Sequence, residues 1–163
     1  MTEVIIDTNV AVVANRQNPD VAQGCVDNCI AFITAAHSQH VVIVDDADAV
    51  RQEYAQALQQ SRPYGLGALF LQHVYQQQFN PNRVRRVNLP IGPDGEYVDF
   101  PGGGALATFD PSDRKFAALS KQTGVAVTNA VDSDWADHLA HLHAAGIVVD
   151  FLCGCDKTKW FTT

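Results

Sequence analysis

Short apolar runs alternate with longer segments of helical periodicity along most of the chain. Continuous β-branched runs are typical of strands buried on both faces of a parallel sheet. The expected strands are VIIDTNV (4–10), VVIV (41–44), VAVT (125–128) and IVVDFL (147–152). Apolar positions three and four residues apart predict helices over about 21–36, 47–60, 65–79, 110–124 and 133–146. This alternation predicts an α/β fold, a three-layer α/β/α sandwich around a mainly parallel sheet.

One stretch, residues 81–109, departs from this alternation and is expected to be irregular. RRVNLPI and EYVDF flank Gly92-Pro93-Asp94-Gly95, a sequence typical of a hairpin turn. Pro101 and the glycines at 102–104 are expected to form a flexible link. We therefore expect one domain over 1–163, with an inserted hairpin-like segment at about 84–108.

Composition narrows the class of protein. Apolar residues make up 47% and charged residues 18% of the chain, which is typical of a globular protein. No apolar run reaches the ~18 residues that a membrane-spanning helix needs. The first residues, MTEVIIDTNV, carry no basic stretch ahead of an apolar one, so we expect no signal peptide and a cytoplasmic location.

The four cysteines are too few for a disulfide scaffold in a chain of this length, and a reducing compartment is the expectation. Cys25 and Cys29 lie one helical turn apart among apolar residues, so we expect small buried side chains there. A zinc site with Cys153 and Cys155 is the alternative, although the usual CxxC or CxxH pairs are absent.

Acidic residues collect where the predicted strands end and helices begin. Asp7 follows the first strand, Asp132 and Asp134 follow VAVT, and Asp113 lies in a helical first turn after the Asp110 cap. In a parallel sheet these positions share one edge, which is where functional groups gather. Each acid alone also fits a capping or solvated role, and Glu53 fits a solvated helix position. Their shared location predicts an Mg²⁺ or Mn²⁺ site, because such close carboxylates repel one another without a cation.

VIIDTNV, Glu53 in the second helix, SDRKFAALS around Asp113 and VTNAVDSDW together resemble the PIN domain, the fold of VapC-like toxin ribonucleases. The resemblance covers nearly the whole chain in the expected order. It implies a metal-dependent endoribonuclease that cleaves RNA with Mg²⁺ or Mn²⁺. It also implies that the protein could be the toxin of a toxin–antitoxin pair, with an antitoxin partner and a homodimeric state.

The resemblance assigns the metal site to Asp7, Glu53, Asp113 and one or both of Asp132 and Asp134. For the fourth catalytic acid we prefer Asp134, which precedes Trp135, although the spacing from Thr128 fits neither aspartate cleanly. Arg114 and Lys115 flank Asp113 and are candidates to meet phosphates. The expected substrate-binding residues are Asn9, Arg114, Lys115 and Thr128.

The net charge of −7 runs against a protein that grips nucleic acid through a basic surface. It motivates an alternative, a PIN-like binding or regulatory module with little or no catalysis. A second alternative is a haloacid-dehalogenase-like phosphatase, whose first strand also ends in Asp. That chemistry uses another Asp two residues later, where this chain has Asn9.

Overall fold

The computed structural model describes residues 1–58 and 65–162, and its centre is a parallel sheet. Within these residues the strands are β1 (Thr2–Ile6), β2 (His40–Asp45), β3 (Val84–Val87), β4 (Val127–Asn129) and β5 (Val149–Phe151). They lie in the order β3-β2-β1-β4-β5, and every neighbouring pair is parallel. The predicted α/β/α sandwich is therefore confirmed.

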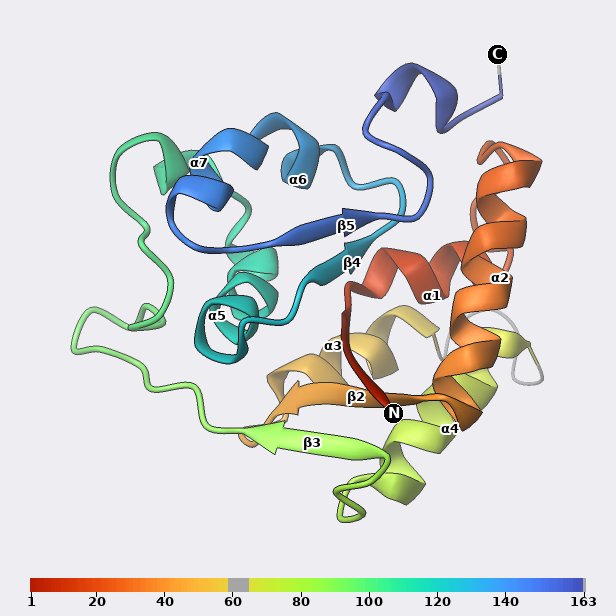
Figure 1. Ribbon diagram of the computed structural model, residues 1–163, viewed down its shortest axis with the longest axis horizontal. Helices are drawn as coiled ribbons and strands as arrows, with labels where there is room; N and C mark the ends of the chain where they lie inside the picture. Colours follow the sequence, from red (N-terminus) through yellow and green to blue (C-terminus); the bar gives the residue numbers. More distant parts are fainter. Residues whose placement is uncertain (59–64, 163) are drawn as a thin grey trace.

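Helices cover both faces of the sheet (Figure 1). They are α1 (Thr8–Ala14), α2 (Gln23–Ser38), α3 (Ala49–Leu58), α4 (Leu66–Gln77), α5 (Arg114–Thr123), α6 (Ser133–Asp137) and α7 (Leu139–Ala144). Short 3₁₀ turns span Gly104–Thr108, Pro111–Asp113 and Lys157–Lys159. Across the described ranges, none of the helices has the length and apolar character needed to cross a membrane.

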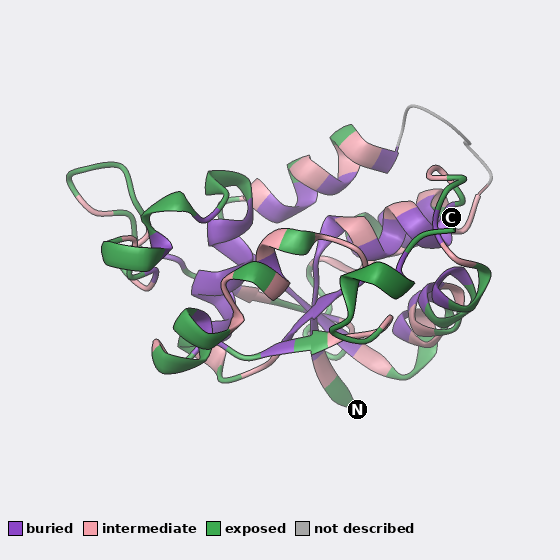
Figure 2. Ribbon diagram, turned by 90° about the horizontal axis from the view of Figure 1, so that it is seen from above, coloured by how far each residue is buried: buried purple, intermediate pink, exposed green. Residues whose placement is uncertain are grey.

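Buried residues gather on the central strands and on the helices that cover them, from α1 to α7 (Figure 2). Ile5, Ile43 and Phe116 are fully buried, as expected where apolar runs are covered on both faces. α5 packs against β1, β2 and β4, and it ends at Gly124, whose φ of 73° suits glycine at a left-handed cap. The predicted helix 110–124 is thus confirmed from Arg114 to Thr123, and the 3₁₀ turn Pro111–Asp113 precedes it.

Several predicted boundaries were wrong for local reasons. The predicted strand 4–10 ends at Ile6, because the Asp7 side chain caps α1 by accepting a hydrogen bond from the Asn9 amide. The predicted helix 133–146 is divided into α6 and α7 at His138, whose φ of −105° and ψ of 8° interrupt the helix. The predicted end of the second helix, at about residue 60, lies outside the described residues.

The segment 84–108 is only partly a hairpin. Its first residues form β3, a parallel strand beside β2, which was not predicted because VRRV lacks an apolar run. A single antiparallel bridge joins Ile91 to Tyr97 around the predicted turn, where Gly95 has a φ of 80°. The inserted part is therefore a short looped excursion that begins after β3.

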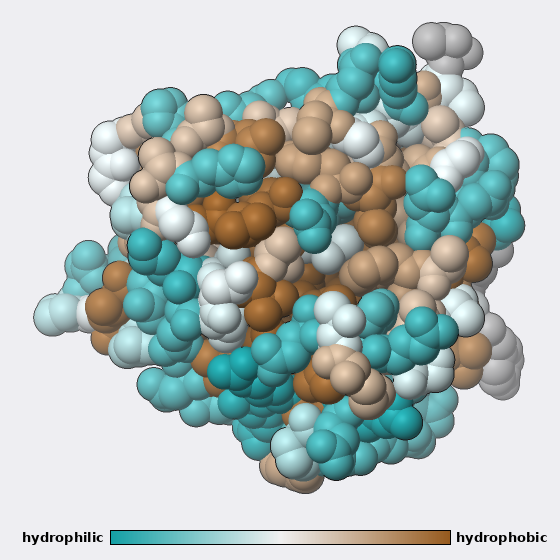
Figure 3. All heavy atoms as spheres, viewed as in Figure 1, coloured by the Kyte–Doolittle hydropathy of each residue, from teal (hydrophilic) through white to brown (hydrophobic). Residues whose placement is uncertain are grey.

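The two edges of the sheet differ in character. At the β3 edge, Arg85 forms an ion pair with Glu3 at 2.9 Å, and charges of this kind discourage pairing with another strand. Figure 3 shows a hydrophilic surface there, whereas apolar side chains gather over β5. Val148, just before β5, is 44% exposed.

The cysteine prediction needs correction. Cys25 and Cys29 are buried on α2 as expected, but Cys25 forms a disulfide with Cys153, 128 residues away. The chain after β5 returns across α2 and brings the two residues together, which no local pattern reveals. Cys29 and Cys155 are free thiols.

Candidate metal centre

The order of the strands creates a switch point between β1 and β4. The chain adds β2 and then β3 on one side of β1, and returns to place β4 and β5 on the other side. In open α/β sheets a crevice forms outside the carboxyl ends of the strands at such a point. Asp7 follows β1 directly and Asp132 follows β4 after two residues, so both acids lie at this switch point.

Asp7 is held on both sides of its carboxylate. One oxygen accepts from the Asn9 amide, and the other accepts from the indole Nε1–H of the fully buried Trp135. The Asp7 amide itself donates to the Thr128 carbonyl at 3.0 Å, which ties the end of β1 to β4. These contacts fix the position of the carboxylate before any ligand binds.

Asp132 sits in a loop that two asparagines hold in shape. The Asn9 side chain donates to Asn129 Oδ1 at 2.9 Å, and its own Oδ1 accepts from the amides of Ala130 and Val131. Asn129 in turn bonds the backbone of Asp132 on both sides. The Asp132 side chain caps α6 by accepting from the Asp134 amide at 2.9 Å. Asn9 and Asn129 therefore act as positioning residues for Asp132.

Asp113 comes from a different layer. It ends the 3₁₀ turn that leads into α5, and Asp110 caps that turn by accepting from the Ser112 amide, as predicted. Asp113 is 5% exposed, and among the described residues its Oδ2 is one of a few buried side-chain polar atoms without a hydrogen-bond partner. A buried oxygen of this kind is costly unless something satisfies it.

These three aspartates converge. One carboxylate oxygen from each of Asp7, Asp113 and Asp132 lies within 4.8 Å of the other two. Burial and then the charge of Asp132 raise the pKa of Asp7 to about 7. Burial and then the charges of Asp7 and Asp132 raise the pKa of Asp113 to about 10. Without a cation, the protein therefore tends to keep protons where neighbouring carboxylates would otherwise repel one another.

The donor set suits a hard divalent cation. Mg²⁺ and Mn²⁺ take carboxylate oxygens and water, and the three aspartates offer oxygens from three segments of the chain. The unpartnered Asp113 oxygen gives a ligand a place to bind. The three aspartates could thus hold a metal ion.

Glu53 lies beside this group but is not part of it. One oxygen accepts from Lys115 Nζ at 2.6 Å, and the other accepts from the Thr8 hydroxyl. Its charge still contributes to raising the pKa of Asp7, so it is close to the group. The structure therefore places this predicted ligand in an ion pair at the margin of the site.

Asp134, which we preferred as the fourth acid, points elsewhere. Its Oδ2 accepts from the Asp110 amide at 2.6 Å and its Oδ1 lies 3.2 Å from His138 Nδ1. Asp132, not Asp134, belongs to the converging group. The reason is that Asp132 caps α6, which turns Asp134 away from the switch point and toward the turn before α5.

The expected substrate-binding residues are mostly occupied within the protein. Arg114 is buried, forms an ion pair with Glu96 at 3.0 Å and donates to the carbonyls of Ala107 and Phe109. Lys115 holds Glu53, and Thr128 is buried in β4. The structure shows these side chains in contact with other residues of the protein. Their contact with a substrate stays a prediction.

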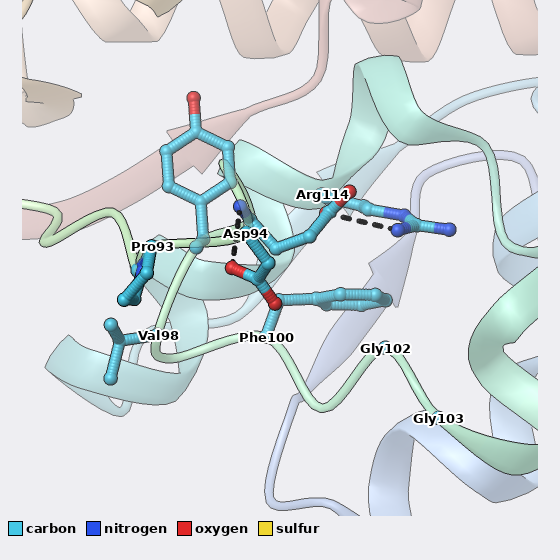
Figure 4. A pocket seen from close by; sticks show the side chains of 10 residues that line it. Pro93, Asp94, Val98, Phe100, Gly102, Gly103 and Arg114 are labelled. Atoms are coloured by element: carbon cyan, nitrogen blue, oxygen red, sulfur yellow. Dashed lines mark hydrogen bonds and ion pairs between the residues drawn. The ribbon is translucent and has the colours of Figure 1, made fainter.

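The inserted segment forms a surface pocket of about 720 Å³. Its lining includes Asp94, Tyr97, Phe100 and Arg114. Figure 4 shows Phe100 and Arg114 at this pocket, and the guanidinium lies 5.1 Å from the ring centre of Phe100. Arg114, which lines this pocket, is the next residue after Asp113 of the acidic group.

Three residues of the site were not among the predicted ones: Asn129, Trp135 and Thr8. Asn129 had a usable signal, since it ends a strand at the same sheet edge as the acids. The indole of Trp135 and the hydroxyl of Thr8 had none, because their roles depend on contacts across 128 and 45 residues of sequence.

No protein-family model, curated protein or solved structure matches the chain. The resemblance to the PIN domain therefore rests on the motifs and their order alone.

Proposed function

We propose that this protein is a metal-dependent endoribonuclease that hydrolyses RNA phosphodiester bonds with a metal-activated water. One observation carries the proposal: Asp7, Asp113 and Asp132 converge at the switch point of a parallel sheet, with no cationic partner among the described ion pairs. Phosphodiester hydrolysis is one of the reactions that such a hard-oxygen site supports. The PIN-like order of motifs supports RNA as the substrate.

Some residues of the site would hold the metal ion, and others position those ligands. Asp7, Asp113 and Asp132 would hold Mg²⁺ or Mn²⁺, which when bound lowers the pKa of a water and stabilises charge on phosphate oxygens. Trp135 and Asn9 fix the Asp7 carboxylate, and Asn9 with Asn129 fixes the loop of Asp132. The Lys115 ammonium keeps Glu53 from adding a further unbalanced charge.

The biological setting extends the proposal. By the same resemblance the chain would be the toxin of a toxin–antitoxin pair, inhibited by an antitoxin protein and able to form a homodimer. The net charge of −7 is consistent with acids gathered where cations neutralise them and bridge to phosphate.

A second candidate is a PIN-like binding or regulatory module. The Glu53–Lys115 ion pair favours it, because Glu53, one of the five predicted metal ligands, already has a counter-ion from the protein. In that case the acidic group would bind a cation and nucleic acid without efficient hydrolysis.

Single-turnover cleavage of a mixed RNA pool tests the enzyme. With Mg²⁺ or Mn²⁺ the wild type should cut the pool, and Asp7→Asn and Asp113→Asn should each abolish cutting. Cutting that survives both substitutions would show a contaminant or a different site. RNA that is bound in a metal-dependent manner but never cut would favour the binding module.

A further inference from the structure

A second group of potential ligands consists of three cysteines and shares no residue with the aspartate group. Cys25 and Cys29 stand one turn apart on α2, and Cys153 follows β5. The three sulfur atoms lie within 4.8 Å of one another. Cys25 and Cys153 share a disulfide, and the Cys29 thiol lies fully buried against them.

This spacing is close to that of a thiolate metal site. A tetrahedral zinc ion with Zn–S bonds of about 2.3 Å separates its sulfur ligands by about 3.8 Å. Opening the disulfide moves Cys25 and Cys153 apart toward that separation, and Cys29 is already near both.

The fold holds Cys153 near α2 without help from the disulfide. Asn28 Nδ2, on α2, donates to the Leu152 carbonyl at 2.9 Å. The Ala22 amide donates to the carbonyl of the buried Trp160 at 2.8 Å, and Val21 bridges to Phe161. The chain after β5 therefore stays against α2 when the sulfurs are reduced, so all three thiols remain together.

Sulfur ligands select a different cation from the aspartates. Soft thiolates favour Zn²⁺ and related ions, whereas carboxylates favour Mg²⁺ and Mn²⁺. Cys153 is half-buried, whereas Cys25 and Cys29 are buried. Cys155 is exposed and does not belong to the three-sulfur group, so it provides a matched control.

We propose that in the reduced protein Cys25, Cys29 and Cys153 bind one Zn²⁺-class ion as thiolates, with water in the fourth position. A dithiol reductant supplies the two electrons and two protons that open the Cys25–Cys153 disulfide, and becomes a disulfide itself. Zinc binding then releases the thiol protons to solvent. Disulfide and metal compete for the same two sulfurs, so oxidation by a disulfide would expel the ion.

Cobalt titration of the protein reduced with a phosphine tests this site. Co²⁺ bound by thiolates absorbs strongly in the near ultraviolet, whereas Co²⁺ on the aspartates gives no sulfur band. The reduced wild type should develop this band to saturation at one ion per chain and lose it when Zn²⁺ is added. Cys29→Ser should weaken binding by at least about tenfold, because it removes one of three ligands. Cys155→Ser and Asp113→Asn should leave the band unchanged.

A second measurement checks that the variants fold. Oxidised Cys29→Ser should still form the Cys25–Cys153 disulfide, read from the mass of alkylated protein. Absence of the sulfur band in the reduced wild type would overturn the proposal, as would equal binding by wild type and Cys29→Ser. Equal loss in Cys29→Ser and Cys155→Ser would overturn the three-sulfur assignment. None of these outcomes depends on RNA cleavage, so the thiolate site and the nuclease activity are tested independently.

Discussion

Asp7, Asp113 and Asp132 can be compared with Glu53, a carboxylate that lies close to them but in a different electrostatic setting. Glu53 accepts from Lys115 and Thr8, so its charge has a counter-ion and its oxygens have donors. The three aspartates have no cationic partner among the described ion pairs, and Asp113 leaves one oxygen unpartnered.

The difference shows which acids are arranged for a ligand. A carboxylate with a protein counter-ion contributes to the fold and gains little from a cation. Carboxylates that repel one another in a buried pocket are costly to the metal-free protein, and a divalent ion removes that cost. Function is therefore indicated by unbalanced charge at the switch point rather than by the number of acids near it.

The largest expected effect separates Asp132 from Asp134. Asp132→Asn should lower the rate of metal-dependent RNA cleavage by at least about 100-fold, about 3 kcal/mol in barrier, because a ligand is lost. Asp134→Asn should change the rate by less than about threefold, since Asp134 contacts Asp110 and His138 instead. Single-turnover rates at saturating metal measure both effects. Equal losses of rate in the two variants would contradict the assignment of Asp132, rather than Asp134, to the metal site.

The next effect is on stability and its pH dependence. The pKa of Asp113 is raised in the folded protein to about 10, whereas in the unfolded chain it is about 4. The folded protein therefore holds the proton of Asp113 more tightly than the unfolded chain does. The stability that this provides is full below about pH 4 and is lost as the pH rises toward about 10. For Asp7 the corresponding loss falls between about pH 4 and about pH 7. Asp113→Asn should therefore stabilise the metal-free protein by about 2 kcal/mol at pH 8 and have little effect at pH 4.

Urea unfolding in the presence of a chelator measures this change. Mn²⁺ should stabilise the wild type at pH 8 and not Asp113→Asn, because binding needs ionised ligands. A variant that is less stable than wild type at pH 8 would show that Asp113 is compensated within the fold.

The ion pair of Glu53 should stabilise the folded protein, unlike the unpaired charge of Asp113. Lys115→Met leaves a partly buried carboxylate without its counter-ion and should destabilise the protein by about 1–2 kcal/mol. The double variant with Glu53→Gln should recover much of that loss, which a double-mutant cycle from urea unfolding measures. If the free-energy changes of the two single variants simply add up in the double variant, the ion pair contributes nothing to stability.

The smallest effect concerns the turn that presents Asp113. Asp110→Ala removes the cap on the Ser112 amide and should cost about 1 kcal/mol of stability. Asp110→Asn keeps an accepting oxygen and should cost only a few tenths of that. Thermal unfolding compares the two variants, and equal costs would indicate that charge rather than capping matters.

The sequence predicted the parts of this molecule that depend on local pattern. Apolar runs located four of the described strands, and strand ends located Asp7 and Asp132 at one edge. β3 was missed because an edge strand such as VRRV is covered on fewer sides and needs no apolar run. The choice between Asp132 and Asp134 depended on which one caps α6, and the two residues lie only two positions apart. The Cys25–Cys153 pair depended on a return of the chain over α2, which only tertiary structure reveals.

The central claim is that three aspartates from separate segments share one divalent cation. Anomalous diffraction from crystals soaked in Mn²⁺ at pH 8 tests it most directly. We predict one manganese peak at about 2.0–2.3 Å from carboxylate oxygens of Asp7, Asp113 and Asp132. A crystal with manganese bound only at other acids, or with none between these three at saturating Mn²⁺, would contradict the account.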